Sequence, residues 1–197
     1  MNNNFKLEPV DILVNINRRH DPFSTMKRRL IGPYEHVFMY MGRLGLFSEG
    51  HSSDLWNVPM LFESNGRGVV LQSLSNRYGQ EVVVMRLKSE HDSKRIPKVL
   101  DEAIKLASEP QSYYDYLCIM RFVLPRILRE RLGLPLPLAW HRDAFQICSE
   151  AVFEVFYRAG LVDILLPYCT PPLPGDFITD SALLEKVWAG ILSQELV

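Results

Sequence analysis

The chain has 197 residues, of which 47% are apolar and 23% charged, and its formal net charge at pH 7 is −1. These values are typical of a soluble globular protein and argue against nucleic acid as the main partner. Its three cysteines are few, odd in number and without a C-x-x-C pair, which is not the pattern of a disulfide framework and disfavours a structural zinc site.

The length suits one domain, and we expect residues 1–197 to form a single domain. The N-terminus lacks the basic segment, apolar run and small-residue cleavage site of a secretory signal. The longest apolar run, residues 116–128, is interrupted by Arg121 and Pro125 and is shorter than the roughly 18 residues of a membrane span. We therefore expect a cytoplasmic protein with reduced thiols and no transmembrane segment.

The first half of the chain is strand-like. Short apolar runs rich in β-branched residues predict strands at residues 10–16, 36–42, 60–64, 69–74 and 81–87. Between the third and fourth of these, "NGRG" (residues 65–68) predicts a hairpin turn, because Asn-Gly accepts the positive φ of tight hairpins.

The second half is helical in pattern. Apolar residues at helical spacing predict helices at residues 94–109, 114–133, 144–160 and 181–193, the second of them broken near Pro125. Pro97 suits a first helical turn and Gly160 a helix end, while Asp143 is the expected N-cap of the third helix. Strands followed by helices predict an α+β fold with a mostly antiparallel sheet packed against helices.

Cys148 lies near the start of the helix predicted at residues 144–160, on one face with Val152, Val155 and Ala159. Cysteine is among the most buried residue types, so this position fits a core thiol. The positive end of a helix also lowers a thiol pKa, and the thiolate is the nucleophilic form. The helix by itself leaves both interpretations open.

A nucleophilic cysteine needs a base, usually histidine, which a third polar group orients. His36 opens an apolar strand, and Glu63 lies within the next one, where a carboxylate is costly without a partner. A ring N–H of His36 would be such a partner. The alternatives are a strand-end histidine bonded to backbone and a glutamate on the solvent side of its strand.

Four stretches, in this order, carry a resemblance: "EPVDILVNI", "PYEHVFMYMG", "FESNGRGVVLQSL" and "QICSEAVFEVFYRAGL". They are similar to motifs of the circularly permuted NlpC-type papain-like cysteine hydrolases, in particular the YiiX/YebB-like group. The later "PPLPGDFITDSALLE" resembles the tail of that group, so that the likeness extends over residues 8–185. Each motif is weak alone, and the order of the four makes the resemblance fairly specific.

The resemblance implies a catalytic triad with Cys148 as nucleophile, His36 as base and Glu63 as the orienting carboxylate. Circular permutation accounts for the order His, Glu, Cys along the chain. The implied reaction is acyl transfer through a thioester, without cofactor or metal, on a small peptide, amide or acyl substrate that could be derived from a cell wall. The Cys148 backbone N–H is the natural oxyanion donor. The Tyr34 hydroxyl is a second candidate, although a packed aromatic ring is the plainer interpretation.

Two other functions stay open. One is a thiol acyltransferase or lipid hydrolase of the LRAT-like kind. Those proteins carry an "NCEHF"-like cysteine motif, which the stretch "ICSEAV" of this chain does not match. The other is a non-catalytic binding domain on the same fold.

Several further residues are weaker candidates. His141 is a rival base, and Glu49, His51 and Asp54 share one loop without a recognisable metal-binding pattern. Cys118 and Cys169 are interpreted as structural.

Overall fold

The computed structural model describes residues 5–18, 32–44, 57–88, 94–109, 147–165 and 172–197, together with the single residues 25, 28 and 133. Its centre is a six-stranded antiparallel sheet in the order β4-β3-β2-β1-β5-β6. The strands are β1 (Ile12–Ile16), β2 (Tyr34–Leu44), β3 (Val58–Asn65), β4 (Gly68–Ser73), β5 (Glu81–Leu87) and β6 (Leu184–Ile191). The α+β class and the antiparallel sheet are thus as the sequence predicts.

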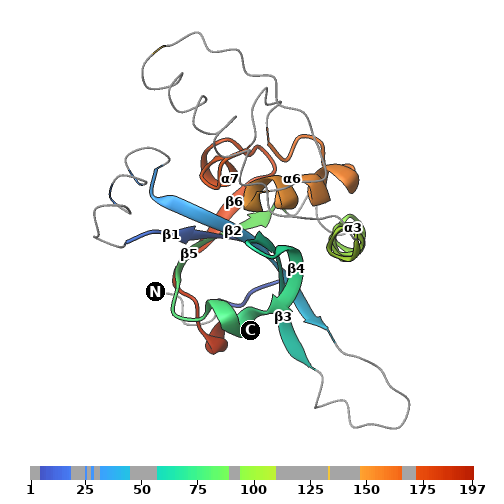
Figure 1. Ribbon diagram of the computed structural model, residues 1–197, viewed down its shortest axis with the longest axis horizontal. Helices are drawn as coiled ribbons and strands as arrows, with labels where there is room; N and C mark the ends of the chain where they lie inside the picture. Colours follow the sequence, from blue (N-terminus) through green and yellow to red (C-terminus); the bar gives the residue numbers. More distant parts are fainter. Residues whose placement is uncertain are drawn as a thin grey trace.

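Helices cover one side of this sheet. They are α3 (Ile96–Ser108), α6 (Cys148–Arg158) and the short α7 (Asp176–Thr179), and there are 3-10 turns at η2 (Leu74–Arg77) and η4 (Gln194–Leu196). The two ends of the described chain lie on the other side, joined by a hydrogen bond from the Leu7 N–H to the Leu196 carbonyl (Figure 1). In the described part of the chain, no helix has the length and apolar character needed to cross a membrane.

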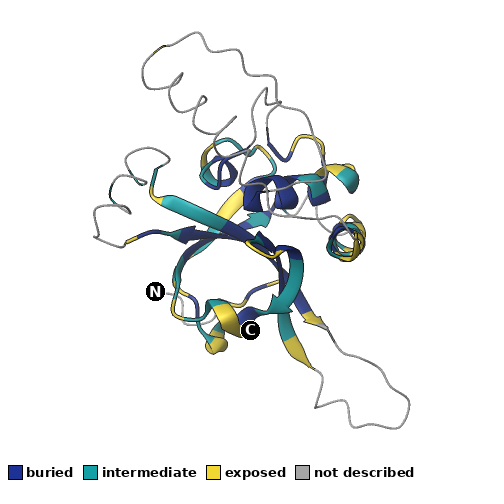
Figure 2. Cartoon of the chain, in the orientation of Figure 1, coloured by how far each residue is buried: buried dark blue, intermediate teal, exposed yellow. Residues whose placement is uncertain are grey.

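The central strands bury side chains on both faces. In β1, Ile12 and Val14 belong to a cluster beneath the helices, whereas Leu13 belongs to a second cluster near the chain ends. This division follows from the alternation of side chains along a strand, and it explains why the central strands are continuously apolar. Figure 2 shows that buried residues concentrate in the central strands and in α6.

The prediction of a helix at residues 181–193 is wrong, because residues Leu184–Ile191 form the edge strand β6. The spacing of Leu184, Val187, Trp188 and Ile191 suits a helix, and the segment contains good helix formers. Its antiparallel pairing with β5, which includes a register shift at Val84/Met85, overrides that local preference.

Two local details also differ from the sequence prediction. The predicted hairpin at residues 65–68 is present, but its positive φ, 101°, is at Gly68 and not at Asn65-Gly66, because Asn65 and Gly68 pair as strand residues on either side of the turn. The N-cap of the third predicted helix is Ile147 and not Asp143, and the Glu150 carboxylate accepts the Ile147 N–H at 2.9 Å. The helix predicted at residues 114–133 lies outside the described residues.

Gly42 bends β2 where its pairing with β3 shifts register. Its φ is +83°, and a β-carbon there would lie 3.1 Å from Cγ of the Pro9 ring. We expect Gly42→Ala to lower the free energy of unfolding by roughly 2–4 kcal/mol, because left-handed backbone strain adds to overpacking.

Gly79→Ala is the matched control in urea denaturation. Gly79 has φ +85°, but a β-carbon there meets no atom within 4 Å. We expect Gly79→Ala to lower the free energy of unfolding by about 1–2 kcal/mol, from backbone strain alone. Equal losses in the two variants would contradict a role for the Pro9 contact.

Candidate active site

The candidate site forms where β2 and β3 separate. The ladder between them runs from Leu44–Val58 to Met39–Phe62, and both strands continue beyond it. His36 and Glu63 lie past the end of this ladder, and α6 packs against both strands. The first turn of a helix and two strand ends therefore meet at one point.

His36 and Glu63 contact each other across the separated strands. His36 Nε2 lies 2.7 Å from Glu63 Oε2. The Glu63 side chain is fully buried, whereas 17% of the His36 side chain remains exposed. Because Nε2 faces the carboxylate, Nδ1 is the ring nitrogen that remains for a partner on the other side.

That partner is Cys148, the first residue of α6 and a buried free thiol. Its sulfur and the His36 ring each shift the pKa of the other, and the backbone N–H groups of Val37 and Ser149 also act on the pKa of the thiol. The Val37 N–H is available because Val37 lies past the end of the β2–β3 ladder. The structure thus brings Cys148, His36 and Glu63 together from three elements far apart in the sequence.

The electrostatics favour an ion pair between sulfur and imidazole. Burial alone would raise the pKa of Cys148, but the His36 charge and the hydrogen bonds to the sulfur outweigh it and lower that pKa. Burial opposes a charge on His36 as well, yet Cys148 first and Glu63 second raise the pKa of His36 to about 9. Near neutral pH the arrangement therefore favours a thiolate facing an imidazolium.

Glu63 stays ionised despite its burial, because donors surround its carboxylate. Burial would raise its pKa, but hydrogen bonds from His36, Arg77 and Asn65, together with the His36 charge, lower it to about 2. Arg77 Nη2 lies 2.7 Å from Oε1 and 2.6 Å from Oε2, and Asn65 Nδ2 lies 2.9 Å from Oε1. The Gln72 amide also donates to Oε1.

Arg77, like Asn65 and Gln72, belongs to this site although the sequence did not predict it. Its Nη2 lies 3.3 Å from His36 Nε2, and its guanidinium lies over the Phe38 ring, 5.7 Å from the centroid. Since the imidazolium N–H at Nε2 points to Glu63, Arg77 and His36 are two cations that share one carboxylate. The cost of burying Glu63 was the only signal in the sequence that more donors were needed.

The remaining candidates fall into two groups. The Tyr34 ring packs against Gly175 and the cluster beneath the helices, and no hydrogen bond of its hydroxyl is recorded among the described residues, so its role as a donor stays a prediction. Cys118, Cys169, His141, Glu49, His51 and Asp54 lie outside the described residues.

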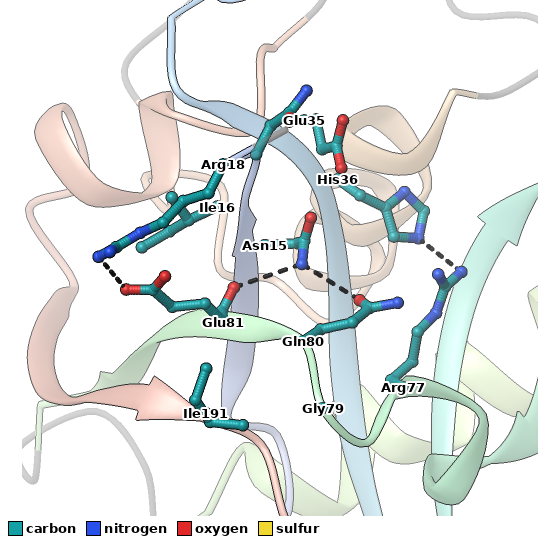
Figure 3. Close-up of a pocket in the computed structure, with 11 residues that line it drawn as sticks. Asn15, Ile16, Arg18, Glu35, His36, Arg77, Gly79, Gln80, Glu81 and Ile191 are labelled. Atoms are coloured by element: carbon teal, nitrogen blue, oxygen red, sulfur yellow. Dashed lines mark hydrogen bonds and ion pairs between the residues drawn. The ribbon is translucent and has the colours of Figure 1, made fainter. Parts of the chain in front are cut away.

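A groove of about 490 Å³ begins at His36 and extends past the ends of β1 and β5 (Figure 3). Its lining is mostly polar. The described residues that line it are Asn15, Ile16, Asn17, Arg18, Glu35, His36, Arg77, Gly79, Gln80, Glu81 and Ile191. Over the described ranges, no three His, Cys, Asp or Glu side chains are grouped so that they could hold a metal ion.

The solved structures that are similar to this chain include one described as the metalloprotein YiiX from Escherichia coli O157:H7. The likeness has a TM-score of 0.62 and covers 95% of this chain and 100% of YiiX, at 17% sequence identity. It shows a shared fold. No model of a protein family matches the chain, and comparison with curated proteins finds no similar sequence.

Proposed function

We propose that the protein is a thiol-dependent hydrolase, an amidase or peptidase, built on a circularly permuted papain-like fold of the NlpC type. Cys148 is the nucleophile, His36 the acid–base group and Glu63 the carboxylate that orients His36. One observation carries the proposal: a buried thiol at the first residue of a helix interacts with a histidine whose Nε2 lies 2.7 Å from a buried carboxylate oxygen. The fold shared with YiiX supports a likeness to the YiiX-like group, and the order of the four sequence motifs is the reason for proposing the permuted fold.

Acylation starts from the ion pair. The Cys148 thiolate attacks the carbonyl carbon, a C–S bond forms, and the carbonyl oxygen becomes an oxyanion. As the oxyanion collapses, the C–N bond breaks and His36 gives its proton to the leaving amine. Glu63 keeps the ring oriented through its bond to Nε2, which leaves Nδ1 toward the sulfur and the reacting atoms.

Deacylation reverses these roles. Neutral His36 takes a proton from water, the hydroxyl attacks the thioester, and the C–S bond breaks to give the acid and the thiolate. The backbone N–H of Cys148, at the open start of α6, is the proposed donor to the oxyanion.

A peptide-like substrate suits the groove beside His36 better than a long acyl chain. Amide, carboxylate and guanidinium groups line most of that groove. An aliphatic chain placed there would displace water from these charged and amide groups and offer them no hydrogen bond in return. The lining therefore favours an amidase or peptidase over a lipid hydrolase.

The description of YiiX as a metalloprotein does not carry over to this site. Arg77 already occupies both Glu63 oxygens, and the Arg77 guanidinium lies 3.3 Å from His36 Nε2. A cation in that position repels a metal ion and leaves neither the carboxylate nor Nε2 available as a ligand. The described residues of the site thus do not fit a metal, and no step is assigned to one.

Trapping the acyl-enzyme tests the proposal. After brief exposure to p-nitrophenyl acetate and an acid quench, we expect mass spectrometry to find one acetyl group per chain, located on Cys148 and removed by hydroxylamine as a thioester. A variant with Cys118→Ala and Cys169→Ala should behave like the wild type. Acetylation spread over all three cysteines, or none on Cys148, would refute the assignment.

A further inference from the structure

The groove beside His36 contains a buried amide with a fixed orientation. Asn15 is only 7% exposed, and on β1 it stands opposite His36 of β2, so that both side chains lie on the same face of the sheet. The Asn15 amide nitrogen lies 3.2 Å from Gln80 Oε1 and 3.3 Å from the Glu81 carbonyl oxygen. A backbone carbonyl only accepts hydrogen bonds, so the contact with Glu81 establishes which end of the Asn15 amide is the nitrogen.

This orientation leaves one acceptor and one donor facing the groove. The Asn15 oxygen points away from Gln80 and Glu81, toward the end of the groove bordered by Glu35 and His36, and Gln80 directs its amide nitrogen toward Arg77 (Figure 3). Among the described residues, no donor is recorded for Asn15 Oδ1 and no acceptor for Gln80 Nε2. A buried acceptor without a partner is costly unless a ligand or water satisfies it.

An acceptor beside a donor is the complement of a peptide unit. Asn15 Oδ1 can accept the N–H of a substrate amide, and Gln80 Nε2 can donate to a substrate carbonyl oxygen. The described lining of the groove includes His36 but not Cys148. His36 is the group that protonates the leaving amine, so the part of the substrate next to it is the leaving-group side.

We infer that the groove is the leaving-group subsite and that Asn15 and Gln80 bind the first peptide amide after the scissile bond. The inference rests on the proposed function and adds a substrate class to it, since the leaving amine must carry a further secondary amide. Glu35, Arg18 and Glu81 then border the path of the following residue.

Partition of the acetyl-enzyme between water and an added amine tests this subsite. The amine of glycylglycinamide attacks the thioester on Cys148, a C–N bond forms, the C–S bond breaks, and the amine proton passes to His36 while sulfur leaves as thiolate. The matched amine is glycylsarcosine dimethylamide, which has a similar amino group but no amide N–H. We expect the ratio of N-acetyl product to acetate to be about tenfold higher for glycylglycinamide.

Variants identify the groups responsible. Asn15→Leu and Gln80→Leu should each lower the ratio for glycylglycinamide toward that of the methylated amine, whereas Asn57→Leu, at an exposed asparagine outside the groove, should keep the wild-type ratio. If Asn15→Leu does not fold, the subsite is still tested by Gln80→Leu and by the comparison of the two amines in the wild type. Because a ratio is measured, differences in the amount of acetyl-enzyme do not affect the result.

Two results would overturn the subsite while leaving the acyl-enzyme in place: equal ratios for both amines in the wild type, or unchanged ratios in the folded variants. In either case, p-nitrophenolate release and acetyl-Cys148 would still be seen. Absence of acetyl-Cys148 would instead overturn the proposed function, and the subsite with it.

Discussion

Replacement of His36 by alanine is expected to slow the acetylation of Cys148 by p-nitrophenyl acetate by roughly 10²–10⁴-fold. The substitution removes the His36 charge and hydrogen bond that lower the pKa of Cys148, so that burial of the thiol, which raises this pKa, is less strongly opposed. The thiolate fraction near neutral pH falls accordingly.

The measurement is p-nitrophenolate release under single-turnover conditions. Imidazole added to the His36→Ala protein should restore part of the rate, because the His36 side chain is partly exposed and its removal leaves space beside Cys148. Rescue by imidazole separates loss of a base from loss of structure. A rate that is unchanged in His36→Ala would contradict the role of this residue.

Glu63→Gln is expected to lower the free energy of unfolding at pH 7 by about 3 kcal/mol. The change keeps the shape of the side chain but removes the carboxylate shared by Arg77 and His36, so that two partly buried cations lose their counter-ion. The double variant Glu63→Gln/Arg77→Met should recover part of the loss, because it removes one unpaired cation as well.

The contribution of Glu63 should depend on pH in a defined window. The pKa of Glu63 is about 2 in the folded protein, against 4.5 for an unperturbed carboxyl. A lowered carboxyl pKa stabilises the fold fully above the unfolded value and progressively less as the pH falls toward the folded value. The difference between wild type and Glu63→Gln should therefore shrink from pH 4.5 to pH 2.

Urea denaturation at several pH values measures this difference. Glu195→Gln, at an exposed glutamate, is the control and should change stability by no more than about 0.5 kcal/mol. A loss in Glu63→Gln as small as in the control would contradict the role of Glu63 as a buried counter-ion.

The strands that could be predicted from the sequence are those whose residue pattern agrees with their burial. β1, β2 and β5 are apolar runs rich in β-branched or aromatic residues, and each pairs with a neighbouring strand on both edges. The edge strand β6 could not be predicted, because its spacing and composition suit a helix and only its pairing with β5 determines its structure. The intrinsic preference of a segment for helix or strand has the least influence on its structure where pairing with a distant strand supplies its hydrogen bonds.

The candidate site divides in the same way. Three of its residues could be recognised from the sequence around them: a thiol near a helix start (Cys148), a histidine that begins a strand (His36) and a carboxylate inside an apolar run (Glu63). Arg77 could not be recognised in this way, because it lies in the 3-10 turn after β4 and comes close to Glu63 only once the sheet has formed. The inward-facing amides of Asn15 and Gln80 likewise become recognisable only when β1 and β5 pair.

The most direct test of the central claim is the pH profile of iodoacetamide labelling at Cys148, followed site by site by mass spectrometry in wild type and His36→Ala. We expect wild-type Cys148 to react readily at pH 6, where an ordinary thiol of pKa about 8.5 is almost wholly protonated, and its profile to move up by a unit or more without His36. If Cys148 instead reacts no faster than Cys118 and Cys169 at pH 6 and its profile does not move in His36→Ala, it is a core thiol and not a nucleophile.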